Sequence, residues 1–341
     1  MKIGVVGASG YSGGELLRLL LNHPIFELEY IAAGSQANLA ISLIHSQLAP
    51  LADRLFEPTE ISRMNDCDLL FFALPHGESA KFMPLIDTQI KIIDLGADFR
   101  LHSSDAWQKY YGGVHAGTWV YGLPEVPGQR EKITHASRIA NPGCFATVIS
   151  LASVPALHFD LIKGEDIVAV AASGTTGAGR KLSPSLLGSE VMNSLSSYKF
   201  GGVHQHIPEI EETLSGLSST AVKISFTPIL APMPRGILAT ITSPLRSALS
   251  TDFMHNLYSD FYQDEEFISV LPKFLLPKTS SVIGSNSIQI QVAVDEHTNR
   301  LVISAVIDNL GKGAASQAIQ NANLISGLPE GIGLSSTGLG V

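Results

Sequence analysis

The sequence predicts an α/β protein of two domains, in which a doubly wound parallel sheet is followed by an α+β domain with a mixed sheet. The first 100 residues alternate short apolar runs with helix-like stretches, and longer alternating segments replace this pattern after about residue 145. The chain has 341 residues, 45% hydrophobic and 16% charged, which is enough for two packed cores and excludes a disordered chain. We expect one domain over 1–145, completed by the C-terminal segment 313–341, and a second over 146–312.

Short apolar strands joined by helical crossovers predict the first domain, because this pattern is typical of a parallel sheet with helices on both faces. Strands are expected at residues 2–6, 27–33, 68–74 and 91–95. Apolar residues at helical spacing predict a helix over 11–22, which stops before Pro24.

Longer strands with few helical crossovers predict the second domain, so its sheet is expected to be mixed, with helices on one face. These strands are expected at residues 167–172, 221–228, 237–243, 287–294 and 301–308. A helix is expected over 252–262. Another, over 314–328, is expected to return to the first domain and pack on it.

Charge and composition exclude several classes of partner. The net charge of −9 argues against nucleic acid, whose binders present a basic face. No apolar stretch approaches the roughly 18 residues of a membrane span, and the N-terminus does not resemble a secretory signal. The two cysteines, Cys67 and Cys144, do not make a disulfide framework. We expect a cytoplasmic protein with neither nucleic acid nor membrane as a partner.

A glycine-rich turn, GASGYSGGE over residues 7–15, follows the first expected strand and opens the first expected helix. Glycines allow a tight turn and close approach of the backbone to a pyrophosphate, which a helix N-terminus attracts. We interpret the turn as a Rossmann-type dinucleotide site. The spacing is G-x-x-G-x-x-G rather than G-x-G-x-x-G, so an ordinary glycine-rich turn is the alternative.

The end of the second expected strand speaks to the choice of dinucleotide. A carboxylate at this place holds the ribose 2′-hydroxyl of NAD. Here the chain reads Gly34-Ser35-Gln36, and Ser35 can donate to a 2′-phosphate, which favours NADP. The alternative is a polar loop without this role.

Cys144 is the candidate nucleophile. It follows Asn141-Pro142-Gly143 and precedes an apolar helical stretch. A helix N-terminus stabilises a thiolate, and Pro-Gly makes a sharp turn that presents the sulfur. The alternative is a buried structural thiol, the interpretation we favour for Cys67 at the start of an apolar strand.

Two histidines, His204 and His206, stand two residues apart, and in an extended segment they would point the same way. They are candidates for an acid/base pair or for two metal ligands. A zinc site needs a further ligand at suitable spacing, and none is convincing, so no metal is expected. A histidine that serves a reactive cysteine is the better interpretation, with the other histidine structural.

Two arginines are candidate anion-binding residues. Arg100 follows a strand of the parallel sheet, where ligands bind, and its alternative is an ion pair with Asp94 or Asp98. Arg235 lies in a proline-rich loop, and its alternative is a surface charge. A second glycine-rich loop, residues 173–181, follows a strand of the second domain and is a weak signal for cofactor binding.

Together these motifs resemble the N-acetyl-gamma-glutamyl-phosphate reductase family of arginine biosynthesis, which is related to aspartate-semialdehyde dehydrogenase and, more distantly, to glyceraldehyde-3-phosphate dehydrogenase. The matching motifs, in shared order across nearly the whole chain, are GASGYSGGEL at 7–16, GADFR at 96–100, YGLPE at 121–125, NPGCFAT at 141–147, SGTTGAGRK at 173–181, HQHIPEI at 204–210 and DNLGKGAA at 308–315. The resemblance implies a second domain like that of glyceraldehyde-3-phosphate dehydrogenase.

The resemblance also implies roles for residues of this chain. Cys144 is the expected nucleophile and His206 the expected acid/base, with His204 as the other choice. The expected NADP(H)-binding residues are Gly7, Ser9, Gly10, Tyr11, Ser12, Gly13, Ser35, Pro75, Ser173, Gly174, Gly177, Ala178, Gly179 and Asn309. The expected substrate-binding residues are Arg100, Asn141, Glu209 and Arg235.

The implied reaction is the NADPH-dependent reduction of N-acetylglutamyl phosphate to its semialdehyde through a Cys144 thioester, in a homodimer or homotetramer. The chain departs from the family's usual residues at Gly96, Gln205 and Pro234, where Ser, Arg and Asn are common. Two alternatives stay open. One is a related reductase for aspartyl phosphate or N-acylated aminoadipyl phosphate, and the other is a non-enzymatic NADP-binding regulator.

Overall fold

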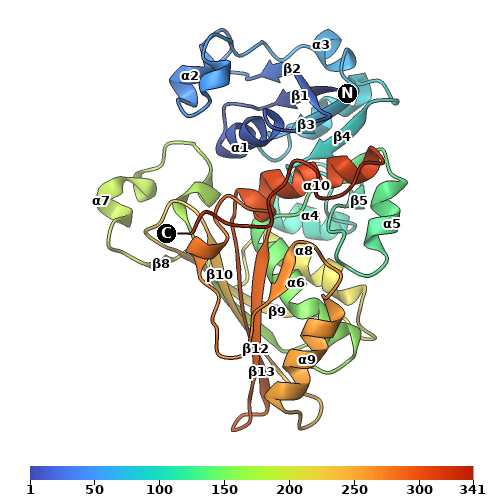
Figure 1. Ribbon diagram of the computed structural model, residues 1–341, viewed down its shortest axis with the longest axis vertical. Coiled ribbons are helices and arrows are strands. Elements are labelled where there is room, and N and C mark those ends of the chain that lie inside the picture. The colour runs from blue at the N-terminus through green and yellow to red at the C-terminus, as the bar shows by residue number, and fades with distance from the viewer. Residues whose placement is uncertain (341) are drawn as a thin grey trace. The chain divides into compact units, whose positions relative to one another are not determined.

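The computed structural model describes residues 1–340, which form two compact units (Figure 1). Unit 1 comprises Met1–Pro142 and Ala314–Leu334, and unit 2 comprises Gly143–Gly313 with the residues from Ser335 onward. Unit 2 thus begins before Cys144, whereas the boundary expected after residue 145 assigned this cysteine to the first domain. The residues after Leu334 also group with unit 2 rather than with unit 1. Val341, the last residue of the expected segment 313–341, lies outside the described residues.

The sheet of unit 1 has six strands, all parallel, in the order β2-β1-β3-β4-β6-β5. The strands are β1 (Lys2–Val6), β2 (Glu27–Ala32), β3 (Leu69–Phe72), β4 (Lys91–Asp94), β5 (Val120–Tyr121) and β6 (Arg138–Ala140). The first four confirm the expected strands. The other two were not predicted, because two or three residues are too few to show a periodicity.

Helices of unit 1 cover the parallel sheet and complete its core. They are α1 (Tyr11–Leu20), α2 (Ile41–Ile44), α3 (Ile61–Asn65), α4 (Ser104–Tyr110), α5 (Gln129–Thr134) and α10 (Ser316–Ile325). The C-terminal α10 packs against α1, α5 and β4, which confirms that the end of the chain returns to the first sheet. Its polar side chains are buried as well, and the Asn321 amide donates to the Gly122 carbonyl at 2.9 Å.

The sheet of unit 2 has seven strands in the order β11-β12-β13-β10-β7-β9-β8. The strands are β7 (Ile167–Ser173), β8 (Ser196–Ser197), β9 (Ile224–Leu230), β10 (Ile237–Pro244), β11 (Ile268–Val270), β12 (Ile288–Asp295) and β13 (Arg300–Ile307). The β7–β9 and β11–β12 pairs are parallel and the others antiparallel, so the sheet is mixed, as predicted. All five expected strands are present, with ends shifted by up to three residues.

One face of this sheet is covered by helices. Among the helices of unit 2, α6 (Cys144–His158), α8 (His206–Ser215) and α9 (Thr251–Phe261) pack against the strands, and α7 (Gly188–Val191) lies in a loop before β8. Burial alternates along β10, where Ile237, Ala239 and Ile241 are buried and Leu238 is 37% exposed. The strands therefore pack on the helices with one face, and the other face remains accessible.

Helix α6 continues through Pro155, whose nitrogen carries no hydrogen, so the carbonyl of Leu151 loses its helical donor. The Tyr262 hydroxyl, next to the end of α9, donates to this carbonyl, and the Tyr258 hydroxyl donates to the Ala152 carbonyl at 2.9 Å. Two tyrosines therefore fasten α9 to the helix that carries the candidate nucleophile at its N-terminus.

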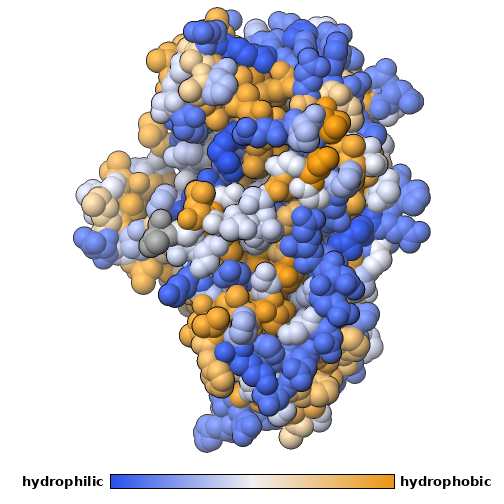
Figure 2. All heavy atoms as spheres, viewed as in Figure 1, coloured by the Kyte–Doolittle hydropathy of each residue, from blue (hydrophilic) through white to orange (hydrophobic). Residues whose placement is uncertain are grey.

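Apolar side chains are exposed in the segment around α7. Leu182 is 95% exposed, and Leu187, Met192 and Leu195 are more than half exposed. In Figure 2 this segment, at the left, shows hydrophobic residues among hydrophilic ones. A contiguous apolar surface of this kind is typical of a contact with a ligand or a partner. Within residues 1–340, no helix has the length and hydropathy to cross a membrane.

Candidate active site

The glycine-rich turn joins β1 to α1 and needs its glycines for steric reasons. Gly7 has φ of +86°, and a Cβ there would lie 2.4 Å from the Ala73 carbonyl oxygen. A Cβ on Gly13 would lie 2.7 Å from the carbonyl oxygen of Gly7, and one on Gly14 would lie 2.4 Å from the His45 ring. The strand order reverses at β1, which lies between β2 and β3, and doubly wound sheets bind ligands at such a point.

The remaining cofactor candidates of unit 1 lie in loops next to this turn. Ser9 and Gly10 belong to the turn itself, and Tyr11 and Ser12 are the first residues of α1. Ser35 is exposed just after the end of β2, with no acidic residue beside it in the sequence. Pro75 is exposed in the loop after β3. The strand ends therefore bring the predicted residues of unit 1 to the same edge of the sheet.

Cys144 is the first residue of α6 and is partly accessible. The backbone N–H of Gly143, directly before it, donates to the Glu209 carboxylate at 2.7 Å. A Cβ on Gly313 would lie 2.8 Å from the Cys144 Cβ, so only glycine allows this close approach. The thiol is thereby held at the N-terminus of a buried helix, where the helix dipole favours its thiolate.

The histidine segment is not extended, which corrects the expectation that His204 and His206 point the same way along a strand. Gln205 has helical backbone angles and His206 begins α8. The two rings nevertheless meet edge to face, with centroids 4.9 Å apart. The helical turn, rather than strand alternation, brings them together, and the His206 N–H donates to Nδ1 of His204 at 3.1 Å.

The two histidines differ in their surroundings. His204 is buried, and burial, His206 and Lys199, in this order, lower its pKa to about 2. His204 is therefore neutral at ordinary pH and accepts a hydrogen bond from the start of α8. His206 is less buried. This contrast favours His206 as the acid/base and His204 as the residue that positions it.

Aromatic rings surround the histidine pair. Phe145, next to the candidate nucleophile, lies edge to face with His204 at 5.4 Å and contacts the His206 ring at 6.0 Å. Phe226 of β9 packs on His204 at 5.1 Å, and Tyr198 lies 5.9 Å from the same ring. These contacts place the histidines directly beside the start of α6, where Cys144 lies.

Sequence reasoning missed Tyr198, Lys199 and Phe226. Burial and the charge of a nearby Cys144 thiolate raise the pKa of the Tyr198 hydroxyl, so this side chain is close to the candidate nucleophile. Tyr198 and Lys199 stand in a loop without periodicity, where no pattern could indicate a role. Phe226 follows strand alternation like any core residue, and only the fold places it against His204.

Arg100 is 6% exposed and lies in the turn after β4. Its guanidinium donates to the carbonyls of Asn141 and Leu95, both at 2.8 Å. Asn141 is also buried, and its amide donates to the Ala314 carbonyl at 3.1 Å. Both predicted substrate-binding residues of unit 1 thus support the backbone of their own unit, and their contact with substrate stays a prediction.

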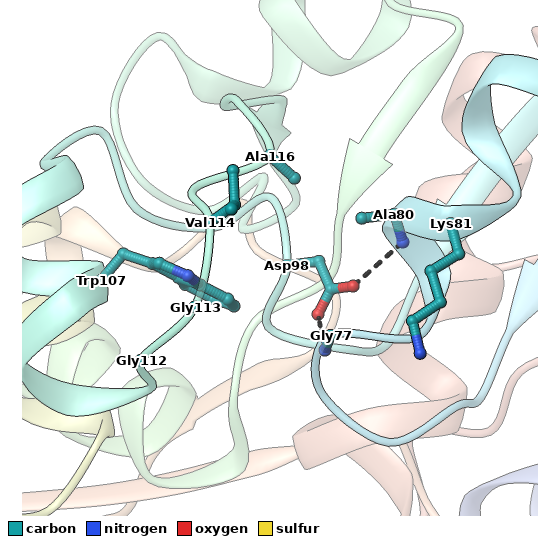
Figure 3. A pocket seen from close by; sticks show the side chains of 9 residues that line it. All are labelled: Gly77, Ala80, Lys81, Asp98, Trp107, Gly112, Gly113, Val114 and Ala116. Carbon is teal, nitrogen blue, oxygen red and sulfur yellow. Dashed lines mark hydrogen bonds between the residues drawn. The ribbon is translucent and has the colours of Figure 1, made fainter.

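Asp98, in the same turn, accepts hydrogen bonds from the N–H groups of Gly77 and Ala80 at 2.6 and 3.0 Å, drawn as dashed lines in Figure 3. The carboxylate holds the loop after β3 in place. It borders a cavity of about 360 Å³ that is also lined by Trp107 and Lys81. Neither the candidate nucleophile nor the histidines line this cavity, so it is not the site of thiol chemistry.

Arg235 forms a two-point ion pair with the buried Asp308 of unit 2. Its Nε donates to Oδ1 at 3.0 Å, and its Nη2 contacts the other carboxylate oxygen. This arginine is three-quarters buried, so it is not the surface charge that the alternative interpretation assumed. The pair closes the loop before β10 onto the end of β13 and engages the charge that was predicted to hold substrate.

The second glycine-rich loop is built against the same loop before β10. The backbone N–H of Gly174 donates to the Gly236 carbonyl at 2.9 Å, and a Cβ on Gly174 would lie 2.7 Å from the Arg235 nitrogen. Asn309 donates to the Thr176 hydroxyl at 3.0 Å. Unit 2 therefore holds this loop, which contains Ser173, Gly177, Ala178 and Gly179, in one defined conformation.

The other cysteine and the question of a metal need little space. Cys67 is buried in unit 1, and burial raises the pKa of its thiol to about 11, which suits a structural thiol. In the described part of the chain, no three His, Cys, Asp or Glu side chains form a group that could hold a metal ion.

Comparison with known proteins places the chain in a family. A model described as "Semialdehyde dehydrogenase, NAD binding domain" matches residues 2–136, and one described as "Semialdehyde dehydrogenase, dimerisation domain" matches residues 144–309. N-acetyl-gamma-glutamyl-phosphate reductase of Acidothermus cellulolyticus is 51% identical over 99% of this chain and 98% of that protein. The chain belongs to the N-acetyl-gamma-glutamyl-phosphate reductase family. The enzyme of the same name from Thermobifida fusca is 50% identical over 98% of both chains.

Solved structures of the wider semialdehyde dehydrogenase group share the fold of this N-acetyl-gamma-glutamyl-phosphate reductase family member. Aspartate semialdehyde dehydrogenase II of Vibrio cholerae superimposes with a TM-score of 0.72 at 17% identity, covering 95% of this chain and 98% of that one. The enzyme of Francisella tularensis gives 0.70 at 15% identity, covering 96% and 100%. At these identities the likeness shows the fold alone, and it confirms the predicted combination of a parallel sheet with a second, mixed sheet.

Proposed function

We propose that this chain reduces N-acetyl-L-glutamyl 5-phosphate to N-acetyl-L-glutamate 5-semialdehyde with NADPH, through a thioester on Cys144, as a step of arginine biosynthesis. The observation that carries the proposal is the group formed by Cys144, Glu209 and the two histidines of unit 2. Cys144 starts α6, the N–H before it is fixed by Glu209, and the rings of His204 and His206 lie 4.9 Å apart next to Phe145.

The residues of unit 1 fit a dinucleotide that carries a 2′-phosphate. Gly7 and Gly13 leave no room for a Cβ, so the backbone of the turn is open to a pyrophosphate. The exposed Ser35 stands where an acid would repel a 2′-phosphate. When bound, NADPH supplies the hydride that reduces the acyl group.

In the first half of the reaction, the Cys144 sulfur forms a bond to the acyl carbon. The bond between this carbon and the phosphate oxygen breaks, and phosphate leaves with the electron pair. His206 takes the thiol proton, because it is the histidine whose pKa is not suppressed by deep burial. Covalent catalysis of this kind replaces one difficult displacement by two easier ones.

In the second half, reduction converts the thioester to a thiohemiacetal oxyanion on Cys144. The backbone N–H groups of the first turn of α6 stabilise this oxyanion, since the positive end of the helix dipole points at it. The carbonyl then re-forms and the C–S bond breaks. His206 returns its proton to the departing sulfur, and the aldehyde leaves.

The same proposal covers assembly and location. Residues 144–309 match a domain described as a dimerisation domain, and the face of its sheet that bears Leu238 is accessible. We propose that the chain forms a homodimer or homotetramer through unit 2. A thiol nucleophile works in a reducing compartment, so we propose a cytoplasmic location.

The test is NADPH oxidation by the purified protein with three acyl phosphates, those of N-acetylglutamate, aspartate and N-acylated aminoadipate. The proposal expects turnover with the first and a specificity constant at least 100-fold lower with the others, because the pocket must bind a particular length and N-acyl group. Equal turnover with aspartyl phosphate, or none with any substrate, would contradict it.

A further inference from the structure

Lys199 lies in a strained loop directly before the histidine pair. Its φ is +44°, in the left-handed region that non-glycine residues rarely adopt, and Gly201 and Gly202 also have positive φ. The preceding β8 pairs with β9, and the Tyr198 N–H donates to the Pro228 carbonyl of β9 at 3.3 Å. Such strain costs of the order of 1 kcal/mol or more and persists where the surroundings fix the conformation. The sheet edge therefore holds the Lys199 backbone in place.

The neighbours of Lys199 belong to the reactive group of unit 2. The side chain of Tyr198 packs on His204 and lies close enough to Cys144 for the two to influence each other's ionisation. The Lys199 cation is itself near enough to His204 to help lower the pKa of this histidine. The ammonium group is thus part of the surroundings of the candidate nucleophile and base.

The charge of Lys199 is not neutralised by the protein. Throughout residues 1–340, no carboxylate forms an ion pair with its ammonium group, which also makes no hydrogen bond. Part of the side chain is desolvated, and this lowers its pKa, yet it remains accessible. The two predicted anion-binding arginines differ, because Arg235 pairs with Asp308 and Arg100 donates to backbone carbonyls. An unpaired, accessible cation beside a thiol and two histidines is suited to an anionic substrate.

We propose that the ammonium group of Lys199 binds anionic oxygens of the acyl phosphate substrate next to Cys144 and His204. The inference rests on the proposed function and adds a substrate-binding residue to it. The oxygens come either from the phosphoryl group or from the α-carboxylate. Both offer the same chemistry to a lysine, and kinetics in the two directions of the reaction tell them apart.

The test compares Lys199→Gln, Lys199→Arg and the wild type, with Lys223→Gln as the control, since Lys223 is an exposed lysine of the same unit. We expect Lys199→Gln to raise the KM for the acyl phosphate about tenfold or more, with the KM for NADPH unchanged. Lys199→Arg should keep most of the affinity, and the control should match the wild type. Lys199→Gly is a second variant that removes the cation and at the same time relieves the positive φ, so loss of folding cannot account for its effect.

The reverse reaction, from aldehyde, phosphate and NADP, identifies the bound group. A higher KM for inorganic phosphate assigns Lys199 to the phosphoryl group, and a higher KM for the aldehyde assigns it to the carboxylate. Unchanged KM values for all three compounds in both Lys199→Gln and Lys199→Gly would overturn the inference. The proposed function fails separately, in that the wild type itself would then not turn over N-acetylglutamyl phosphate.

Discussion

The carboxylate of Glu209 accepts a hydrogen bond of 2.7 Å from the backbone N–H of Gly143, the residue directly before Cys144. Glu209 lies in the first turn of α8, which begins with His206, and it is 2% exposed. A single buried interaction therefore ties the helix of the candidate base to the helix of the candidate nucleophile. The resemblance placed Glu209 at the substrate, whereas the geometry gives it a role in positioning.

Replacing Glu209 tests this role. Glu209→Ala leaves the Gly143 N–H buried without this acceptor, which typically costs about 1–3 kcal/mol of stability. We expect turnover to fall at least tenfold, while Glu209→Gln, whose side-chain oxygen still accepts, should retain more of both. Urea unfolding and steady-state kinetics measure the two effects. A Gln variant as impaired as the Ala variant would show that the charge, and not the hydrogen bond, is what matters.

The two histidines should respond differently to substitution. His206→Asn should lower kcat more than it raises KM, because proton transfer is lost during the reaction itself. His204→Asn should do less and should leave the pH profile of kcat unchanged in shape. Its native pKa of about 2 keeps His204 neutral over the whole range of an assay from pH 5 to pH 9. Disappearance of a limb of the profile in His204→Asn would reverse the assignment.

Asp94 should make unit 1 more stable at lower pH. Burial, followed by the charge of Asp98, raises its pKa to about 7 against hydrogen bonds from Ser79 and Gly96. The unfolded chain releases this proton near pH 4, so between about pH 4 and pH 7 the folded state binds more protons. Its contribution to stability therefore falls as pH rises through this window, by up to about 1.4 kcal/mol per pH unit. Above pH 7 the group adds no further dependence.

Asp94→Asn should remove this dependence, since its Oδ1 still accepts from Ser79 and it carries no charge. The midpoint of thermal unfolding, recorded at pH 5 and pH 8, should differ less in this variant than in the wild type. The exposed Asp53→Asn is the matched control in the same unit. A wild-type protein that is more stable at pH 8, with Asn at position 94 making no difference, would contradict the assignment.

Cofactor choice should depend on Ser35. The wild type should use NADPH with a higher specificity constant than NADH, because no carboxylate follows β2 to repel the 2′-phosphate. Ser35→Asp should shift this preference toward NADH. The check is the specificity constant of each protein with each cofactor. Better use of NADH by the unmodified chain would refute this interpretation of the strand end and leave the thiol chemistry untouched.

Sequence patterns predicted the parts of the fold that are long and periodic. The strands at 167–172 and 237–243 lie where alternation placed them, because each buries one face on helices. Strands β5 and β6 hold two and three residues and leave no period to detect. The histidine segment shows a further limit, since Pro208 follows HQH in the first turn of a helix, and proline is compatible with that position as well as with an extended segment.

The candidate site was predictable where one short motif carries the chemistry, as for Cys144 and Gly7. It was not predictable where distant residues decide what a side chain does. Arg235 is engaged by Asp308, 73 residues away, and this partner cannot be seen in the local sequence. Lys199 is placed by the pairing of β8 with β9, a contact that two-residue strands do not announce.

The thioester on Cys144 is the central claim, and trapping it is the most direct test. The protein is mixed with N-acetylglutamyl phosphate in the absence of NADPH, quenched in acid, digested and analysed by mass spectrometry, with released phosphate measured in parallel. The account predicts an N-acetylglutamyl adduct on the peptide that contains Cys144, with one phosphate released per adduct, and none on the buried Cys67. In Cys144→Ser both signals should vanish. Full NADPH-dependent turnover by Cys144→Ser, or phosphate release from the wild type without an adduct on Cys144, would contradict the account.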